Sequence, residues 1–392
     1  MYSRGLRVLA VATGDVSNGH EEDIRDLEFV GLIGMIDPPA PGVQETIAEF
    51  RAAGVRTVMI TGDQRRTAEA VARQLNMLSA QEQVLDGVEI DQLSDEQLAA
   101  RLSVVGAFSR ITPDAKLRLV RAYQQRGDIV AMLGDGINDA AALRKADVGV
   151  AMGQRGTDVA KEAASVVLQD DRFETIGVAI RQGRIIFDNI RKFVFYLFSC
   201  NLSEVLVLLV AGAAGLPLPL LPLQILWLNL VTDTFPALAL AVEPGEADVM
   251  QRPPRDPQQA IMSRAFVGSV LFYGALITVA TLAAYLMALQ RDPEQARTVA
   301  FMTLGLAQAL HLGTARSKGH VLGRSALSNR AAFTALLLVI ALQLVTVFYE
   351  PLSRVLRTVP LDRNAWLLVW GMAALPAIVG QAARLLRKLP DK

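Results

Sequence analysis

Cysteine and net charge are the two things that this sequence most clearly lacks. It contains a single cysteine, Cys200, which excludes an intrachain disulfide framework and a cysteine-rich metal site. Its 39 basic and 39 acidic residues leave a net charge of zero. A general nucleic-acid-binding protein needs a basic surface, so this balance disfavours that class, and no nucleic-acid partner is expected.

Charged residues of either sign are also scarce, at 20% of the chain, whereas hydrophobic residues make up 52% and the mean hydropathy is +0.32. A soluble chain usually has about 25% charged residues. Most of the charge lies in residues 1–192, and the sequence beyond Phe193 is strongly apolar in long segments. We therefore expect two domains, a soluble one over residues 1–185 and a membrane one over residues 186–392.

The first half alternates short apolar stretches, rich in β-branched residues, with helical patterns. Strands are expected at 8–12, 29–35, 55–60, 104–108, 129–133 and 148–151, and helices at 43–53, 67–75, 112–126 and 138–144. Apolar strands that alternate with helices are typical of a parallel sheet with helices on both faces. The pattern predicts an α/β fold for this half.

The second half contains about six apolar stretches near the ~20 residues that a helix needs to cross a bilayer. They lie at 193–214, 218–241, 264–289, 297–315, 332–350 and 364–386. This pattern predicts an all-α domain in the lipid bilayer. Lysine and arginine concentrate in alternate loops, although the opposite loops hold some arginines, so we expect both termini and the soluble domain to be cytoplasmic.

Two polar elements of the soluble half stand at the ends of predicted elements, where open α/β sheets bind ligands. Thr61-Gly62-Asp63 follows a strand and offers a hydroxyl and a close backbone approach to a phosphoryl oxygen. Lys116, early in a helix, can place a positive charge on a transferring phosphoryl group. Each has an ordinary alternative, since Thr-Gly-Asp is a common turn and a single lysine is usually a solvated helix residue.

A third element, from Gly134 to Ala140, is more specific. It has the sequence Gly-Asp-Gly-Ile-Asn-Asp-Ala and opens a helix after an apolar strand. Its carboxylates, Asp135 and Asp139, need a cation or paired donors, and they can hold Mg²⁺ while phosphate supplies the other ligands. With the three elements in this order, a phosphoryl-transfer site is the favoured interpretation.

These motifs resemble those of the P-type cation-transporting ATPases, in particular the subgroup that contains the calcium pumps of sarcoplasmic reticulum and their bacterial relatives. The stretches that carry the resemblance are Gly34–Pro39, Met59–Asp63, Met132–Ala140, Met152–Lys161 and Asn229–Asp233. The resemblance extends over essentially the whole chain. It implies an α/β haloacid-dehalogenase-like phosphorylation domain followed by the C-terminal transmembrane helices of a multi-pass plasma-membrane protein.

The resemblance also implies a reaction, ATP + H₂O → ADP + phosphate, coupled to cation transport with Mg²⁺ as the cofactor. Asp135 is then the implied Mg²⁺ ligand, and Asp139 is implied to orient the same centre. The implied contacts to the phosphates of ATP, or to a phosphorylated aspartate, are Thr61, Gly62, Asp63, Arg110, Lys116 and Asn138.

The nucleophile of that family, the aspartate of an Asp-Lys-Thr-Gly-Thr motif, does not occur in this sequence. Also missing are the Thr-Gly-Glu loop of the actuator domain and nearly all of the nucleotide-binding domain. We interpret the chain as the C-terminal portion of a pump, inactive in isolation. It is a truncated product, a fragment, or one half of a split enzyme whose separate N-terminal half has this motif. The alternatives are a catalytically incomplete membrane subunit or truncated remnant, and a membrane-tethered phosphatase, against which the missing nucleophile argues.

Polar residues within the apolar stretches predict an ion site, because such residues are costly in lipid. Asn201 and Glu204 share one helix face by their i, i+3 spacing. Asn229, Thr232 and Asp233 share a face of the next helix by i, i+3, i+4 spacing, and the short connector lets the two faces converge. An all-oxygen set suits a hard cation such as Ca²⁺ and argues against copper or zinc.

Gln308, in the fourth apolar stretch, stands where the sarcoplasmic pump has a glutamate, and it keeps an oxygen ligand but removes a charge. Ca²⁺ is the expected cation, with Na⁺, K⁺ and Mn²⁺ as alternatives. Each of these polar residues can instead form hydrogen bonds that hold neighbouring helices together, a common role of such side chains in membrane helices. The segment from Phe173 to Ala214 has few helix breakers, and we expect one long helix that links the phosphorylation domain to the ion site.

Overall fold

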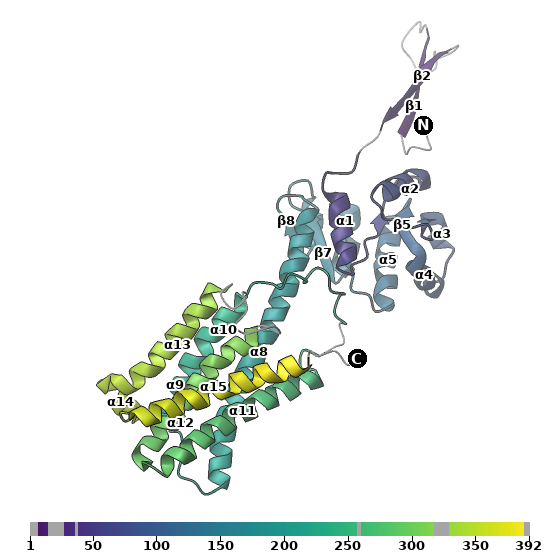
Figure 1. Ribbon diagram of the computed structural model, residues 1–392. Coiled ribbons are helices and arrows are strands. Elements are labelled where there is room, and N and C mark those ends of the chain that lie inside the picture. The colour runs from purple at the N-terminus through teal and green to yellow at the C-terminus, as the bar shows by residue number, and fades with distance from the viewer. Residues whose placement is uncertain (1–6, 15–26, 36–37, 257–259, 317–328, 388–392) are drawn as a thin grey trace. The chain divides into compact units, whose positions relative to one another are not determined.

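The computed structural model describes residues 7–14, 27–35, 38–256, 260–316 and 329–387, except for the side chains of Arg7 and of residues 384–387. The chain divides into two compact units. The first unit is formed by Met1–Arg181 with Asp248–Pro257, and the second by Gln182–Ala247 with Gln258–Lys392. Figure 1 shows the strands and short helices of the first unit and the long helices of the second.

The first two strands, β1 (Arg7–Thr13) and β2 (Glu28–Met35), pair antiparallel as a separate two-stranded sheet. The expectation that they belong to a parallel sheet is wrong. Periodicity shows which residues are extended, but it does not report the direction of the neighbouring strand. Large apolar side chains of β2, such as Phe29 and Ile33, are more than half exposed.

The other strands of the first unit form two three-stranded parallel sheets, in the orders β3-β5-β4 and β6-β7-β8. Their bounds are β3 Met59–Ile60, β4 Gln83–Asp86, β5 Val105–Ser109, β6 Ala131–Gly134, β7 Val148–Met152 and β8 Val166–Leu168. The parallel arrangement agrees with the sequence pattern, although the expected single sheet is two. The pattern missed β4 and β8, which are short edge strands.

Helices cover these sheets and fill the connections between strands. They are α1 Val43–Ala52, α2 Arg65–Gln74, α3 Gly87–Asp91, α4 Asp95–Arg101, η3 Leu102–Val104, α5 Pro113–Gln125, η4 Ile137–Asp139, α6 Ala140–Lys145 and α7 Asp158–Ala163. Helix α5 contacts both sheets, because Leu119 packs with Phe108 of β5 and Val120 packs with Met132 of β6. The first unit is therefore an α/β structure, as the alternating pattern predicts.

The described residues contain six helical spans that are long and apolar enough to cross a membrane, and each overlaps one predicted stretch. The helices are α8 Glu174–Ala213, α9 Pro222–Leu228, η5 Asn229–Asp233, α10 Thr234–Ala241, α11 Arg264–Leu289, α12 Pro293–Arg316, α13 Arg330–Phe348, α14 Glu350–Leu356 and α15 Arg363–Arg387. Consecutive α9, η5 and α10 form one span. The chain passes from the first unit to the second within α8, a continuous helix close to the predicted bounds.

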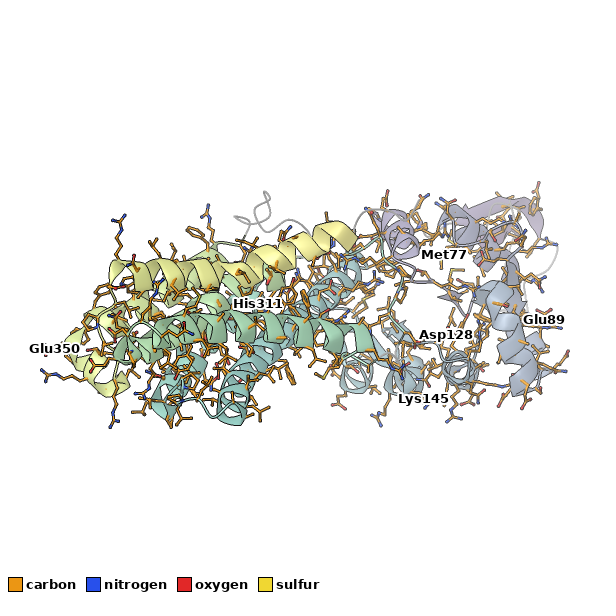
Figure 2. All side chains as sticks on the ribbon, turned by 60° about the horizontal axis from the view of Figure 1, so that its bottom comes forward. Met77, Glu89, Asp128, Lys145, His311 and Glu350 are labelled. Carbon is orange, nitrogen blue, oxygen red and sulfur yellow. The ribbon has the colours of Figure 1, made fainter. Side chains whose placement is uncertain are left out.

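Helix α12 forms the centre of the second unit, and most of its side chains are buried. Its His311 packs among aromatic rings, with centroid distances of 5.9 Å to Tyr196 and 4.9 Å to Tyr273. Figure 2 shows His311 within these helices and Glu350 at one end of them, where α14 begins. The core of this unit is therefore built around α12.

A buried polar cluster ties together the helices that meet after α10. Arg316 Nε lies 3.0 Å from Glu243 Oε2, and the two side chains are 10% and 8% exposed. Asn329, which caps α13, donates from Nδ2 to the same Glu243 oxygen at 2.6 Å. Asn189 of α8 donates to the Glu243 carbonyl at 2.7 Å. Residues of α8, α12 and the start of α13 therefore share one acidic partner.

Candidate functional site

The predicted phosphate-binding turn follows β3 directly. The Thr61 N–H donates to the Phe108 carbonyl at 3.0 Å, which continues the β3–β5 pairing by one residue. The Thr61 hydroxyl donates to Asp63 Oδ2 at 3.0 Å and accepts from the Asp63 N–H at 3.1 Å. Gly62 is exposed between them, and a Cβ atom there would meet nothing within 4 Å. The turn therefore presents its polar atoms beside open space.

Arg110 directly follows the neighbouring strand β5 and has the left-handed backbone conformation, with φ of +53°, which is uncommon for a residue with a side chain. Its N–H donates to the Asp63 carbonyl at 3.0 Å. The next N–H, of Ile111, donates to the Thr61 carbonyl at 3.1 Å. Strained backbone of this kind clusters at functional sites, where the surrounding structure maintains it.

Lys116 and Asp139 form an ion pair, with 2.5 Å between Nζ and Oδ1 and with side chains that are 18% and 9% exposed. Lys116 lies in the first turns of α5, which begins with a Thr112 hydroxyl cap and with Pro113 as its first residue. Asp139 Oδ2 also accepts from the Gly136 N–H at 3.1 Å. Both carboxylate oxygens of Asp139 are engaged, so this pair holds a lysine charge just beyond the end of β6.

Asp135 presents an exposed carboxylate on the same loop. Its carbonyl accepts from the Thr157 N–H at 2.9 Å, and Arg155 Nε lies 3.8 Å from its Oδ2. The N–H groups of Gln154 and Arg155 donate to the Asp171 carboxylate, and these bonds hold the pKa of Asp171 below its usual value. The sequence analysis did not name Arg155 or Asp171, which the structure places beside this loop, although Arg155 stands within one of the motifs that carry the resemblance.

The start of α5 connects the two groups of candidate residues. Ile111, just before this helix, bonds to Thr61 beyond β3, and Lys116 pairs with Asp139 beyond β6. The structure therefore brings the turn after β3 and the loop after β6 to the same helix start. Asn138, on the loop after β6, is exposed.

The described part of the first unit offers only a partial site for Mg²⁺. Nowhere in the described chain do three histidine, cysteine or carboxylate side chains gather in a way that could hold a metal ion. Mg²⁺ is usually bound by one or two carboxylates, with waters and substrate phosphates as its other ligands. The exposed Asp135 carboxylate fits that role if phosphate oxygens complete the coordination.

In the second unit, Glu204, Gln308 and Thr232 form a buried hydrogen-bonded chain across three helical segments. Gln308 Nε2 donates to Glu204 Oε1 at 3.0 Å, and the Thr232 hydroxyl donates to Gln308 Oε1 at 2.9 Å. Glu204 is 4% exposed, and the other two are fully buried. Gln308 of α12 therefore joins α8 to η5. This arrangement is compatible with two roles, hydrogen bonding that holds the helices together and a set of cation ligands.

Asn229–Asp233 is π-helical, whereas the sequence spacing was interpreted as that of an ordinary helix. Pro236 has no N–H to donate to the Thr232 carbonyl, its normal helical acceptor four residues earlier. The Tyr196 hydroxyl donates to that carbonyl at 2.6 Å instead. Single π-helical turns occur frequently at functional sites.

Asp233 and Asn201 form the second polar contact of this region. The Asn201 amide donates to Asp233 Oδ2 at 2.9 Å, and the Asn201 side chain is exposed in the described chain. Within the described residues, Asp233 Oδ1 and Asn229 Oδ1 are buried without a hydrogen-bond partner. Such oxygens are costly unless a ligand uses them. Thr232 directly precedes Asp233, so both acids belong to one polar cluster.

Comparisons with known proteins match both parts of the chain. Residues 217–386 match the family model for the C-terminus of cation transporting ATPases, and residues 6–147 match the haloacid dehalogenase-like hydrolase model. The calcium-transporting ATPase of Bacillus subtilis is 46% identical over 99% of this chain, and the human calcium-transporting ATPase type 2C member 1 is 36% identical over 100% of it. The chain belongs to the P-type cation-transporting ATPases.

This membership confirms the family resemblance and the fold class predicted from the sequence. A P-type ATPase of this kind joins a haloacid-dehalogenase-like part to membrane helices. This chain is a multi-pass integral membrane protein, with six candidate spans among its described residues. The matched region is the C-terminal portion of the relatives. The chain spans 44% of the length of the Bacillus subtilis protein and 42% of that of the human protein.

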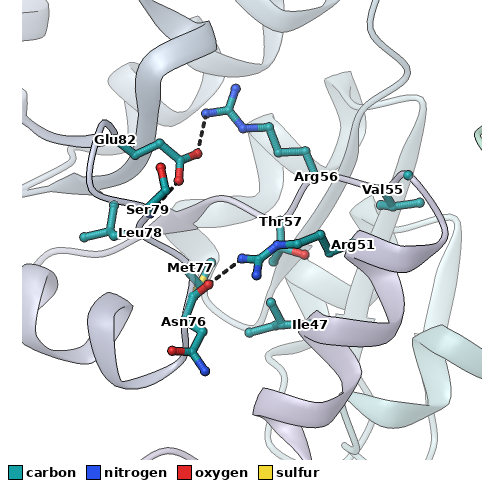
Figure 3. Close-up of a pocket in the computed structure, with 11 residues that line it drawn as sticks. Ile47, Arg51, Val55, Arg56, Thr57, Asn76, Met77, Leu78, Ser79 and Glu82 are labelled. Carbon is teal, nitrogen blue, oxygen red and sulfur yellow. Dashed lines mark hydrogen bonds and ion pairs between the residues drawn. The ribbon is translucent and has the colours of Figure 1, made fainter.

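A cavity of about 730 Å³ lies elsewhere in the first unit of this P-type ATPase (Figure 3). Arg51 of α1 donates to the Asn76 carbonyl across it, and Arg56 donates to Glu82 at 3.3 Å. Thr57, which also lines it, precedes β3, whereas the phosphate-binding turn follows that strand. The cavity is therefore at the opposite end of β3 from the candidate site.

Proposed function

We propose that this chain supplies the phosphoryl-transfer site and the cation-binding helices of an ATP-driven Ca²⁺ pump. The reaction is ATP + H₂O → ADP + phosphate, coupled to movement of Ca²⁺ across the membrane. Two relatives that match the whole chain are named as calcium-transporting ATPases. The observation that carries the proposal is the buried oxygen cluster around Glu204 and Asp233, because such a cluster within apolar helices suits a hard cation.

The charges of this cluster favour a divalent cation. Glu204 and Asp233 together offset two positive charges, and the neutral Gln308 adds an oxygen without a third negative charge. Among the described residues, no hydrogen-bond donor contacts Asn229 Oδ1 or Asp233 Oδ1, so a cation that binds there displaces none of them. The proposed ligands are Asn201, Glu204, Asn229, Thr232, Asp233 and Gln308. Mn²⁺ is the second candidate because it has the same charge as Ca²⁺. The single charge of Na⁺ or K⁺ would offset only one of the two carboxylates.

At the other site, the proposed contacts to the phosphates of ATP come from the residues named from the sequence. Lys116 places a positive charge on the phosphoryl oxygens, and the ion pair with Asp139 orients its Nζ. Gly62 lets the backbone approach those oxygens because it has no Cβ. Arg110 and Asn138 are the further proposed contacts. When bound at Asp135, Mg²⁺ supplies positive charge that offsets the phosphate oxygens.

In this proposal, the aspartate that accepts the phosphoryl group belongs to an Asp-Lys-Thr-Gly-Thr motif that these 392 residues do not contain. Among the described strands, β3 pairs only with β5, and β6 pairs on one side only, with β7. The Ile60 side chain of β3 packs against the core clusters of both sheets. A strand inserted between β3 and β6 would join the two sheets and place its carboxyl end beside Thr61 and Asp135.

We further propose that residues 1–185 form the phosphorylation part and residues 186–392 the cation-binding part of a plasma-membrane pump with cytoplasmic termini. Arg191 and Lys192, before the first apolar stretch, support this orientation. Helix α8 contains Glu204 and also residues of the first unit, so it is the proposed coupling element. In the complete pump, a flexible glycine insertion near Arg191 is expected to uncouple ATP hydrolysis from transport. Transport that stays coupled would exclude α8 from this role.

Equilibrium binding of radioactive Ca²⁺ tests the cation site, with the chain alone and with the chain co-expressed with the N-terminal half of the Bacillus subtilis relative. Glu204→Gln and Asp233→Asn are each expected to weaken binding by roughly tenfold or more, because each removes one charge from the ligand set. Glu350→Gln changes an exposed glutamate at the start of α14 and is the matched control. Competition with Mn²⁺, Na⁺ and K⁺ ranks the alternative ions. Wild-type binding in both variants would exclude this cluster as the ion site.

Phosphorylation by labelled ATP tests the other site. The chain alone is expected to remain unlabelled, whereas co-expression with that N-terminal half should give an acyl phosphate that hydroxylamine releases. Labelling of the chain alone would contradict the need for a separate nucleophile and favour an autonomous enzyme. No labelling in either case, with Ca²⁺ binding intact, would favour a catalytically incomplete membrane subunit.

A further inference from the structure

The second unit contains a cavity of about 800 Å³ that the proposed transport reaction does not use. It lies where α11 begins and α12 ends, and residues of α8 and α15 complete its wall. Arg191 and Lys192 of α8 line it directly before the apolar stretch of that helix. Basic residues at the end of a membrane span mark the level of the lipid headgroups. The cavity is therefore positioned between headgroups and hydrocarbon.

The mouth of this cavity carries two cations, Arg191 and Lys192, that form no ion pair within the described part of the chain. Arg191 and Lys192 are half-buried, and no carboxylate of the described residues forms an ion pair with either. The Arg191 guanidinium lies 5.8 Å from the centroid of the Phe266 ring, which holds it over the wall of the cavity. Arg316 also lines the cavity, but its guanidinium is paired with Glu243.

The interior of the cavity is aromatic and leaves open space. The ring of Phe195 lies 6.1 Å from that of Phe266 and 5.6 Å from that of Tyr273, measured between centroids. All three line the cavity. Gly268 lines it as well, and a Cβ atom there would meet nothing within 4 Å. A positive mouth over an apolar interior matches a molecule with one anionic end and one hydrocarbon end.

We infer that this cavity binds an anionic phospholipid, with its phosphate between Arg191 and Lys192 and its acyl chain against the aromatic wall. Basic pockets between membrane helices commonly hold anionic headgroups, and phosphate oxygens accept charge-assisted hydrogen bonds. Asp188 and Glu246 also line the mouth, so the competing occupant is a zwitterionic lipid whose ammonium group would face them. The anionic lipid fits better because neither Arg191 nor Lys192 forms an ion pair with a carboxylate among the described residues.

Native mass spectrometry of the full chain tests this inference. The protein is purified in equal amounts of phosphatidylglycerol, phosphatidylethanolamine and phosphatidylcholine, and the lipid that stays bound is identified. We expect one retained phosphatidylglycerol. Gly268→Leu fills the open space inside the cavity and should abolish this retention. Arg191→Gln should weaken it about fivefold, the effect of one basic residue near an anionic lipid.

Two matched variants control for general effects on lipid binding. Gly371→Leu also adds a side chain at a helical glycine with open space, and Arg330→Gln removes an arginine at the start of α13 outside the cavity. Both should retain phosphatidylglycerol as the wild type does. Preference for phosphatidylethanolamine, equal retention of all three lipids, wild-type retention by Gly268→Leu, or equal loss in Gly371→Leu would each overturn the inference.

Discussion

The two units of this chain position their polar residues in different ways. In the first unit, Thr61 and Arg110 lie in turns whose backbone hydrogen bonds hold them at strand ends, next to solvent. In the second, Glu204 and Gln308 bond side chain to side chain away from solvent. Water can satisfy a polar group at a strand end, but a buried one needs a protein partner or a ligand. A buried oxygen such as Asn229 Oδ1, which has no partner in the described part of the chain, is therefore stronger evidence for a ligand than an exposed oxygen.

The two units also differ in how their backbone hydrogen bonds are satisfied. A helix pairs its N–H and C=O groups within itself, whereas a strand depends on its neighbours. The six spans of the second unit therefore form from their own residues. In the described part of the first unit, β3 and β6 each pair on one side only. A strand edge without a neighbour can therefore indicate a partner strand outside the described residues, whereas a single helix gives no such indication.

The largest expected loss of stability lies in the buried ion pair of the second unit. Arg316→Met leaves the buried Glu243 without its cation and should lower the free energy of unfolding by about 4 kcal/mol. Arg354→Met breaks the exposed pair with Glu350 and should cost less than about 1 kcal/mol. Denaturant unfolding of the detergent-solubilised chain measures both. Equal losses of unfolding free energy would show that burial does not make the Arg316–Glu243 pair more important for stability than the Arg354–Glu350 pair.

Alanine substitutions at Gly134 and Gly62 compare a closely packed position with an open one in the first unit. A Cβ atom at Gly134 would lie 2.5 Å from Asp139 Cβ, so Gly134→Ala should cost about 3 kcal/mol. Gly62→Ala meets no atom within 4 Å and should change the free energy of unfolding by less than about 0.5 kcal/mol. The same unfolding measurement applies. A comparable cost at Gly62 would contradict the open turn after β3.

Variants of the Lys116–Asp139 pair test whether a largely buried ion pair also stabilises the first unit. Lys116→Met should cost about 2 kcal/mol, because it leaves a largely buried carboxylate with one hydrogen-bond donor fewer. Adding Asp139→Asn should recover part of that loss, since the amide carries no charge. Lys161→Met, at a pair with the exposed Asp158, is the control. If the double variant loses as much free energy of unfolding as the two single variants lose together, the two side chains are not energetically coupled.

The smallest expected effect concerns the carbonyl that Pro236 leaves without a helical donor. Tyr196→Phe removes the hydroxyl that bonds to the Thr232 carbonyl and should cost about 1 kcal/mol. In a Pro236→Ala background the new N–H can serve the same carbonyl, so the cost of Tyr196→Phe should fall. A double-mutant cycle on the free energy of unfolding measures this coupling. Identical costs in both backgrounds would argue that the hydroxyl is not compensating for proline.

Much of the fold could be predicted from local pattern, and the errors have physical causes. The residues of β1 and β2 were predicted, but their antiparallel pairing was not, because strand direction depends on the partner. The contacts of Arg155 with Asp135 and Asp171 were not predicted, because neither Arg155 nor Asp171 lies at a predicted strand end. The π-helical turn at Asn229–Asp233 was also missed, because the polar spacing alone is compatible with an α-helix.

Hydrophobic length and periodicity were enough to locate the six spans and the strand–helix alternation, because each reflects how one segment meets lipid, core or water. Which side chains meet depended on the packed structure. Lys116 pairs with Asp139 across 23 positions of the chain, and Gln308 bonds to Glu204 across 104. No local pattern encodes such distances, since a contact between remote residues exists only after the elements that carry them have packed together.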